Sequence, residues 1–163
     1  MHRRATCWHL APHDMPVGMT ETQRIVDILG GKRTLGVIPK TEFDFIQLVR
    51  KGLPYKALQK ALDAIGIPVR DLSRVLRLPP RTLARRKESA HHLSPTESER
   101  FLRFVRALAR AEEVLGDKEA ALAWLRSPNR SLGSARPEEL LDTDIGAQSV
   151  MDVLGRIEHG VFN

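Results

Sequence analysis

Aromatic residues, cysteine and long apolar runs are all scarce in this chain. Aromatic side chains make up 5% of the 163 residues, which favours a core of Leu, Ile, Val and Ala packed between helices. The single cysteine, Cys7, cannot form an internal disulfide, so a reducing cytoplasm is the expected compartment. No apolar run approaches the ~20 residues that a membrane-spanning helix needs, and no membrane partner is expected.

The residue patterns of common catalytic sites are missing as well. The sequence has no glycine-rich phosphate loop, no paired zinc-ligand spacing and no serine in a nucleophile elbow. The pair Asp142 and Asp144 flanks a threonine before a predicted helix, where carboxylates compensate the helix dipole. Cys7, His9 and His13 lack a fourth ligand and form at most a weak metal site. We therefore predict no enzyme, no metal and no cofactor.

Positive charge is abundant and concentrated in the middle of the chain. The net charge is +6 and the isoelectric point is about 10.0. Residues 65–110 contain eleven Lys and Arg against four Asp and Glu, a net of +7, whereas residues 128–163 have three arginines against six acids. A basic segment of this kind is typical of a surface that binds a nucleic acid, and the mildly acidic end predicts a different partner.

Apolar residues recur at helical spacing along most of the chain from residue 20. Capping residues, prolines and glycines mark the ends of these segments, including Ser94 followed by Pro95 and Glu97. We predict an all-α fold, a multi-helix bundle, with a basic link at residues 32–38. The predicted helices contain residues 21–29, 43–49, 58–65, 69–77, 80–88, 95–115, 118–126, 137–141 and 144–159.

The helices predicted at residues 69–77 and 80–88 form a pair separated by Leu78-Pro79-Pro80. Proline is tolerated at the first helical position but not in a helix interior, so one helix ends before the two prolines and another begins at them. This pattern predicts a helix-turn-helix, with an ordinary solvated helical hairpin as the alternative. The residues predicted to contact DNA surround Leu83 and Ala84 on the second helix, and they are Arg81, Thr82, Arg85, Arg86 and Lys87.

Several short motifs follow one another from the second of these helices to the end of the chain. Two of them belong to the helix-turn-helix and the start of the long helix, and the others lie in the last third of the sequence. They are Arg81-Thr82-Leu83, Leu93-Ser94-Pro95, Ala120-Ala121 with Trp124-Leu125, Ser127-Pro128-Asn129, Leu140-Leu141-Asp142-Thr143, Gly146-Ala147 and Leu154-Gly155-Arg156-Ile157-Glu158-His159-Gly160.

With these motifs the chain resembles the Xre/MbcA/ParS antitoxins, the partners of RES-domain toxins in bacterial type II toxin–antitoxin pairs. The resemblance covers roughly residue 36 to the end. It implies a homodimeric antitoxin that binds the operator DNA of its own operon and silences a RES toxin, an enzyme that degrades NAD, by covering its active site. It implies a DNA-binding domain at residues 19–93 and a toxin-binding domain at residues 94–163. Residues 1–18 have no counterpart in the family, and because they lack apolar periodicity we expect them to be a disordered leader.

The toxin contacts are expected at the end of the chain, where the last four residues could insert into the toxin pocket with Phe162 as an apolar plug. The alternative is a frayed tail, which chain ends commonly are. Two other functions stay open at this point, a stand-alone transcription regulator whose C-terminal part only dimerises, and an undetected enzyme. The predicted toxin-binding residues are Arg156, Glu158, His159, Gly160, Val161, Phe162 and Asn163.

Overall fold

The structure is a computed structural model that describes residues 19–89 and 92–160. Within these residues the chain is all-α, as predicted, and the one β-type contact is an isolated bridge between Pro54 and His92. The predicted leader at residues 1–18 lies outside the described residues. The helices are α1 Glu21–Ile28, α2 Gly31–Leu35, α3 Glu42–Lys51, α4 Tyr55–Ile65, α5 Val69–Val75, α6 Pro80–Ser89, α7 Pro95–Leu115, α8 Lys118–Arg126, the 3-10 helix η1 Arg130–Leu132, α9 Pro137–Leu140 and α10 Asp144–Glu158.

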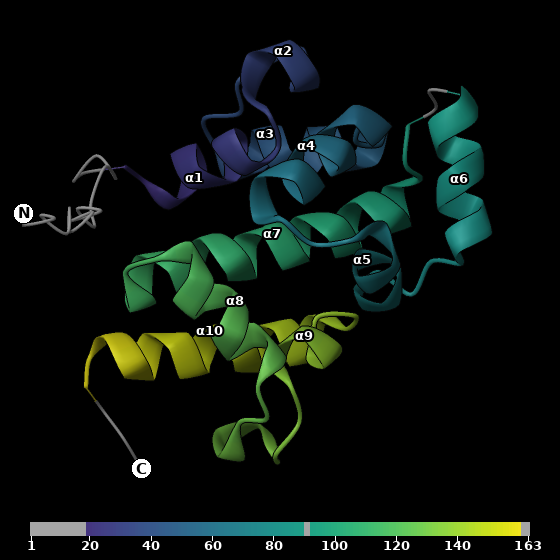
Figure 1. Ribbon diagram of the computed structural model, residues 1–163. Helices are drawn as coiled ribbons and strands as arrows, with labels where there is room; N and C mark the ends of the chain where they lie inside the picture. Colours follow the sequence, from purple (N-terminus) through teal and green to yellow (C-terminus); the bar gives the residue numbers. More distant parts are fainter. Residues whose placement is uncertain (1–18, 90–91, 161–163) are drawn as a thin grey trace, which may run out of the picture.

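The long helix α7 runs through the middle of the molecule. Figure 1 shows α1 to α4 on one side of it, α8 to α10 on the other, and α5 with α6 near its first turns. Helix α7 contacts α1, α3, α8 and α10. The boundary predicted between residues 93 and 94 falls at the start of α7. Helices from both predicted domains pack against α7.

The centre of the core is the side chains of α7. Phe101 is fully buried and Phe104 is 1% exposed. Ala107, Ala109 and Ala111 are also buried, and their small side chains let the neighbouring helices approach the α7 backbone closely. Apart from one exposed stripe that includes Glu99, Arg106 and Glu113, α7 is buried over most of its circumference, so it requires other helices around it.

Local capping explains why the predicted start of α7 matches the observed one. Ser94 Oγ accepts a hydrogen bond from the backbone N–H of Glu97 at 3.2 Å, and Glu97 Oε2 accepts one from the backbone N–H of Ser94 at 2.6 Å. This reciprocal capping box confirms the start that the sequence predicts for α7. Helix α3 begins with a second box between Thr41 and Asp44, and the backbone hydrogen bonds from Lys40 and Thr41 lower the pKa of the Asp44 carboxyl.

The junction between α3 and α4 is fastened to the first turns of α7. The backbone N–H of Leu53 donates to the buried Ser98 Oγ at 2.8 Å, and the backbone N–H of Leu93 donates to the carbonyl oxygen of Leu53 at 2.8 Å. Gly52 has φ +89° at this crossing, and a Cβ atom there would lie 2.2 Å from the carbonyl oxygen of Leu93. Only glycine fits this position.

Some details differ from the sequence prediction. Part of the predicted link at residues 32–38 is helix α2, because Thr34 and Leu35 are buried between two left-handed glycines, Gly30 and Gly36. Phe43 and Ile46 of α3 are apolar, yet they are 63% and 46% exposed. The helix buries a narrower apolar face than its composition suggests.

Replacing Phe101 by alanine is expected to lower the free energy of unfolding by about 3–5 kcal/mol, because the change removes a fully buried ring from the shared helix and leaves a cavity. Urea unfolding followed by circular dichroism measures this loss. Phe43→Ala is the matched control, because the Phe43 ring is 63% exposed and its removal leaves no cavity. Equal losses in the two variants would contradict the central position of α7.

Candidate functional site

Helices α5 and α6 form the predicted pair around a short buried turn. Leu76, Leu78 and Leu83 are buried between the two helices and the rest of the domain. Ser73 Oγ donates to the carbonyl oxygen of Leu78, whose backbone N–H donates to the carbonyl oxygen of Ser73 at 2.9 Å. Arg77 adopts the left-handed conformation, with φ +49°, which ends α5 two residues before the predicted position. The turn thereby fixes the direction of the α6 axis relative to α5.

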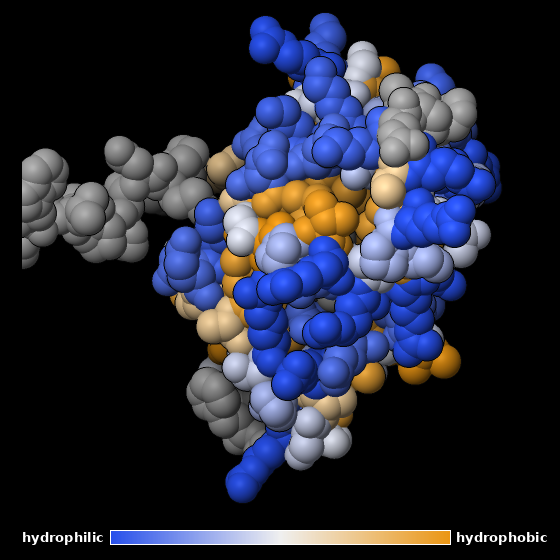
Figure 2. All heavy atoms as spheres, turned by 45° about the vertical axis from the view of Figure 1, so that its right-hand side comes forward, coloured by the Kyte–Doolittle hydropathy of each residue, from blue (hydrophilic) through white to orange (hydrophobic). Residues whose placement is uncertain are grey.

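The outer side of α6 presents positive charge. Arg81 and Arg85 are exposed one helical turn apart, and Thr82 beside them is half-buried. Together with Pro79 and Ala84 these residues line a shallow hollow of about 490 Å³. The right-hand side of Figure 1, where α6 lies, comes forward in Figure 2, and hydrophilic residues cover most of that face around one apolar area. This surface can contact a polyanion.

Arg86, predicted to contact DNA, points inward instead. Its Nη2 lies 3.0 Å from Glu97 Oε2, and its Nη1 donates to the carbonyl oxygen of His92 at 2.9 Å. The side chain of Arg86 is 24% exposed and that of Glu97 is 10% exposed, so this is a largely desolvated ion pair. Residue 86 lies three positions after the buried Leu83 and shares its face, whereas Ala84, expected to be buried, is exposed. Arg86 attaches α6 to the first turn of α7.

Lys87 is exposed but belongs to a neighbouring surface. It lines a hollow of about 520 Å³ with Lys56 and Lys60 of α4, where Asp63 supplies the one carboxylate of the lining residues. The basic charge therefore continues from α6 toward α4. Sequence reasoning did not include the two α4 lysines, because their proximity to Lys87 depends on how α4 packs.

Most arginines of α7 do not contribute to this basic surface. Arg103 Nη2 lies 2.8 Å from Glu99, and Arg106 Nη2 lies 3.0 Å from Glu42 of α3. Arg110 binds Glu113 at 2.8 Å, and this hydrogen bond is the main cause that raises the pKa of Arg110. The +7 charge of residues 65–110 is thus partly neutralised by pairs within the chain.

The outer side of α10 forms a second candidate surface, on the side of α7 opposite α1 to α4 in Figure 1. Ile145 is 82% exposed, more than any other large hydrophobic residue in the described part of the chain. Asp152 and Arg156 follow at helical spacing on the same side and are exposed. A groove of about 530 Å³ runs between α10 and η1, and its lining residues are Ser131, Leu132, Ser149, Met151, Asp152, Gly155, Arg156 and His159.

The structure divides the predicted toxin-binding residues into three groups. Arg156 and His159 line the α10 groove, and Gly160 is exposed beside it. Glu158 instead points to α7, where its Oε2 lies 2.5 Å from Arg110 Nη2. Val161, Phe162 and Asn163 lie outside the described residues. Ile145 was missed because a lone apolar residue in the first turn of a helix gives no sequence signal of exposure.

The start of α10 depends on close packing against α9. Thr143 Oγ1 accepts a hydrogen bond from the backbone N–H of Gly146 at 3.1 Å and caps the helix. A Cβ atom at Gly146 would lie 2.1 Å from the carbonyl oxygen of Leu140, so a larger residue would push the two helices apart. These contacts explain the Gly146-Ala147 motif and fix the direction of the α10 outer face.

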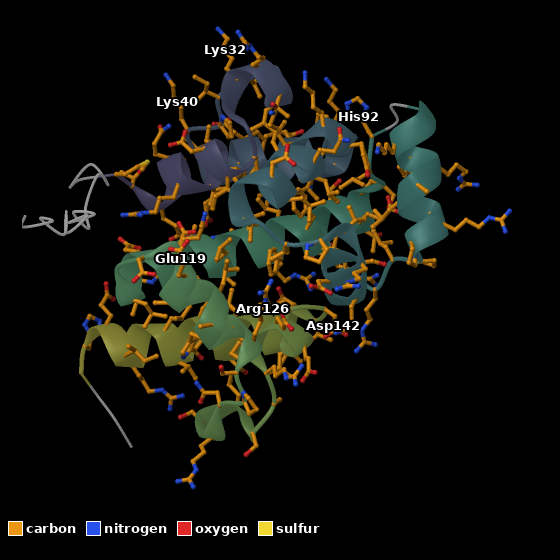
Figure 3. All side chains as sticks on the ribbon, viewed as in Figure 1. Lys32, Lys40, His92, Glu119, Arg126 and Asp142 are labelled. Carbon is orange, nitrogen blue, oxygen red and sulfur yellow. The ribbon has the colours of Figure 1, made fainter. Side chains whose placement is uncertain are left out.

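One ion pair joins the two candidate surfaces. Arg77, in the turn before α6, lies 2.8 Å from Asp142 Oδ2, and Asp142 is located between α9 and α10. Figure 3 shows Asp142 at the α9 end of the C-terminal helices, beneath α5. Arg77 is 66% exposed and Asp142 is 15% exposed. The Arg77 guanidinium therefore binds a carboxylate of the same chain and is not part of the α6 surface.

Among residues 19–89 and 92–160 we find no cluster of three or more His, Cys, Asp or Glu side chains that could hold a metal ion. In the same residues, no helix is both long and apolar enough to cross a membrane.

Replacing Arg86 by alanine is expected to lower the free energy of unfolding by about 1–3 kcal/mol, because Glu97 would stay largely buried without its cationic partner. Arg81→Ala is the matched control on the same helix, and because Arg81 is exposed its effect should stay within about 0.5 kcal/mol. Chemical denaturation of both variants measures the difference. Equal stability of the two variants would contradict the inward role of Arg86.

Two family models match adjacent parts of the chain. A model of the Xre-like helix-turn-helix domain of antitoxins matches residues 44–106, which include α5 and α6. A model of the antitoxin Xre/MbcA/ParS C-terminal toxin-binding domain matches residues 110–160, which include α10. The two matches meet within α7.

Curated relatives extend the match over most of the chain. An Antitoxin Xre from Yersinia enterocolitica is 42% identical over 149 residues, covering 91% of this chain and 97% of the relative. An Antitoxin Xre from Photorhabdus laumondii is 34% identical over 132 residues, covering 80% and 89%. A Prs ADP-ribosylating antitoxin from Sphingobium sp. is 27% identical over 128 residues, covering 73% and 80%. The chain therefore belongs to the Xre family of antitoxins and combines a helix-turn-helix domain with a toxin-binding domain.

Proposed function

We propose that this antitoxin neutralises a RES-domain toxin that degrades NAD, by covering the active site of the toxin, and that it represses its own operon by binding operator DNA. The observation that carries the proposal is the presence of two separate outward surfaces. The basic side of α6 faces outward beside the first turns of α7, and the exposed side of α10 with its groove lies on the side of α7 opposite α1 to α4. One chain can then bind DNA and a toxin at different places.

The DNA part of the proposal rests on the residues that α6 directs outward. Arginine binds the O6 and N7 atoms of guanine with two hydrogen bonds, and Arg81 and Arg85 have the exposure and spacing to enter a major groove. Thr82 can contact a phosphate or a thymine methyl group, and Lys87 can contact the DNA backbone. Arg86 takes the role of a positioning residue, since it fixes α6 on α7.

A pair of chains suits this recognition better than one chain. A single helix reads only a few base pairs, so a homodimer on a palindromic operator is the expected arrangement. Each recognition helix would then enter the major groove in one half of the operator. The pairing surface itself is a separate question.

The toxin part rests on the α10 face. NAD is an anion, so the mouth of an enzyme that binds NAD is expected to be cationic, and a partner that covers it should carry exposed carboxylates. Glu158 does not meet this need, because Arg110 binds it. Asp144 and Asp152 are exposed beside Ile145, which gives the face an apolar centre with acidic neighbours.

The name of one relative supports the choice of partner. The Sphingobium relative is named a Prs ADP-ribosylating antitoxin, and ADP-ribosylation uses NAD as the donor of the ADP-ribose group. A toxin that consumes NAD therefore fits this family. The alternative is a stand-alone regulator. Such a regulator would need neither the toxin-binding domain that residues 110–160 match nor the exposed α10 face.

Replacing Arg81 and Arg85 together by alanine is expected to weaken binding to the promoter fragment of the antitoxin's own operon by about 100-fold or more, because each arginine–guanine contact contributes about 1–3 kcal/mol. Fluorescence anisotropy at one fixed salt concentration measures the change. The control removes two arginines at the other end, Arg130→Ala with Arg136→Ala, and should bind like the unmodified protein. Unchanged binding by the α6 variant would reject α6 as the recognition helix.

Replacing Ile145 by aspartate is expected to weaken binding to an inactive variant of the RES toxin at least tenfold, because the change places a charge at the apolar centre of the α10 face. Calorimetric titration measures the affinity, and cellular NAD in co-expressing cells reports neutralisation. Val69→Asp, at an exposed apolar position beside the helix-turn-helix, is the matched control. Wild-type affinity of the Ile145 variant would exclude this face as the contact.

The same assay separates the α10 face from the tail. A chain ending at His159 keeps the groove and loses the proposed plug, Gly160 to Asn163. Toxicity released by this truncation would support insertion of the tail, and unchanged neutralisation would reject it.

A further inference from the structure

A cationic hollow lies between α4 and the end of α6, and the arginines of the α6 outer side are not part of it. Lys56 and Lys60 of α4 and Lys87 of α6 line this lysine hollow, which has a volume of about 520 Å³. All three lysines are exposed. Asp63 is the one carboxylate among the lining residues, so positive charge predominates. The lysine hollow is therefore a candidate site for an anion.

The positive charge of the three lysines is not compensated within the described part of the chain. Arg86 on the same helix binds Glu97, but no described residue forms an ion pair or a hydrogen bond with the amino group of any of the three lysines. Asp63 lines the same hollow without binding them. Lys56 and Lys60 are one helical turn apart, and like charges at this spacing destabilise a helix. An anion from outside the chain would remove this repulsion.

Packing positions one of the lysines, and neutral donors accompany it. A Cβ atom at Gly30 would lie 2.8 Å from Lys60 Cγ, so the stem of Lys60 packs on the backbone between α1 and α2 while its amino group stays in solvent. Gln59 and Tyr55 line the hollow as well and supply an amide and a hydroxyl donor. Ammonium, amide and hydroxyl groups are donors that proteins commonly use to bind DNA phosphates.

The location of the lysine hollow favours DNA phosphates as the anion. In a helix-turn-helix the first residues of the recognition helix contact base edges, and Arg81 lies in that part of α6. Lys87 lies in the last turn. An α-helix fills most of the width of a major groove, so the last turn of α6 would leave the groove beside the phosphates of one strand. The α4 lysines can contact the next phosphates of that strand.

We infer that the lysine hollow binds phosphates of the operator backbone beside the bases that α6 reads, with Lys56, Lys60 and Lys87 as the cationic ligands. Such contacts carry no information about the base sequence. They raise the affinity for every DNA sequence by the same factor and fix the position of the chain on the duplex. The inference rests on the DNA part of the proposed function and extends the interface from α6 to α4.

The first experiment replaces Lys56 and Lys60 together by glutamine in the full chain. Fluorescence anisotropy measures binding to the promoter fragment and to an unrelated fragment of equal length, at several salt concentrations. The variant should bind both fragments more weakly by the same factor, and the slope of log K against log salt should be shallower by about 1.8 per bound chain, because each neutralised phosphate contributes about 0.9. The double arginine variant, K56R with K60R, should keep the original slope. An unchanged slope, or a loss confined to the promoter fragment, would overturn the inference.

Two controls separate a phosphate site from a change in net charge or folding. Lys32→Gln with Lys40→Gln removes two exposed lysines that Figure 3 shows at α2 and the link that follows it, away from α6. This variant should keep the slope of the unmodified chain, and a loss equal to that of the α4 variant would overturn the inference. Because Lys56 and Lys60 repel each other, replacing them should leave the urea midpoint unchanged or raise it. A lowered midpoint would contradict this repulsion.

Ethylation interference locates the contact on the DNA, because an ethylated phosphate has lost its negative charge. The unmodified chain should show interference at phosphates beside the bases that Arg81 and Arg85 contact. The variant without Lys56 and Lys60 should lose interference at some of these phosphates and keep the others. The same interference pattern for both chains would overturn the inference.

These outcomes are distinguishable from a failure of the proposed function. A chain that binds its promoter no better than the unrelated fragment would reject operator repression, and a shallower slope of the α4 variant on both fragments would then still support the lysine hollow as a phosphate site. Specific promoter binding with equal slopes for the unmodified chain and the α4 variant would reject the lysine hollow and retain the proposed function.

Discussion

Burial of α7 on nearly all its sides is the constraint on which the rest of the structure depends. The fully buried Phe101 and the almost fully buried Phe104 each stabilise the fold by about 1.5–3 kcal/mol, and helices from both halves of the chain supply the surfaces that bury them. Helix α7 also binds α6 and α10, the two helices that carry the candidate surfaces. Glu97 in its first turn binds Arg86 of α6, and Arg110 near its end binds Glu158 of α10. The DNA-facing and toxin-facing sides are therefore parts of one framework.

The many arginines stabilise the packing of the helices as well as supplying positive charge for binding. Arg77, Arg103, Arg106 and Arg110 all form ion pairs with carboxylates of the same chain, several of them between helices far apart in sequence. A guanidinium can bind carboxylates and carbonyl oxygens together, which suits the seams between small helices. The net charge of a segment consequently overstates the charge that its surface offers to a partner. The α6 surface is defined by which arginines are left outward.

The sequence predicted the helices well because their ends are set by local chemistry. Ser94 with Glu97 and Thr143 before α10 form their caps with residues three positions away, so short patterns suffice. The direction of single side chains depends on neighbours from distant segments and was less predictable. Arg86 and Glu158 were expected at partner surfaces but bind Glu97 and Arg110. The spacing of Arg86 from Leu83 was the one available signal, whereas the exposure of Phe43 required the packing of α3.

The direct ion pair between the two candidate surfaces can transmit only a limited influence from one to the other. Arg77 and Asp142 connect the turn before α6 to the junction of α9 and α10 at 2.8 Å. Because Arg77 is 66% exposed, solvent screens this pair, and such pairs contribute at most about 1 kcal/mol. A toxin that broke the pair could change DNA affinity through it by no more than about fivefold, and DNA would change toxin affinity by the same factor. Stronger coupling would have to come from α7, which binds both α6 and α10, or from the number of copies assembled on the operator.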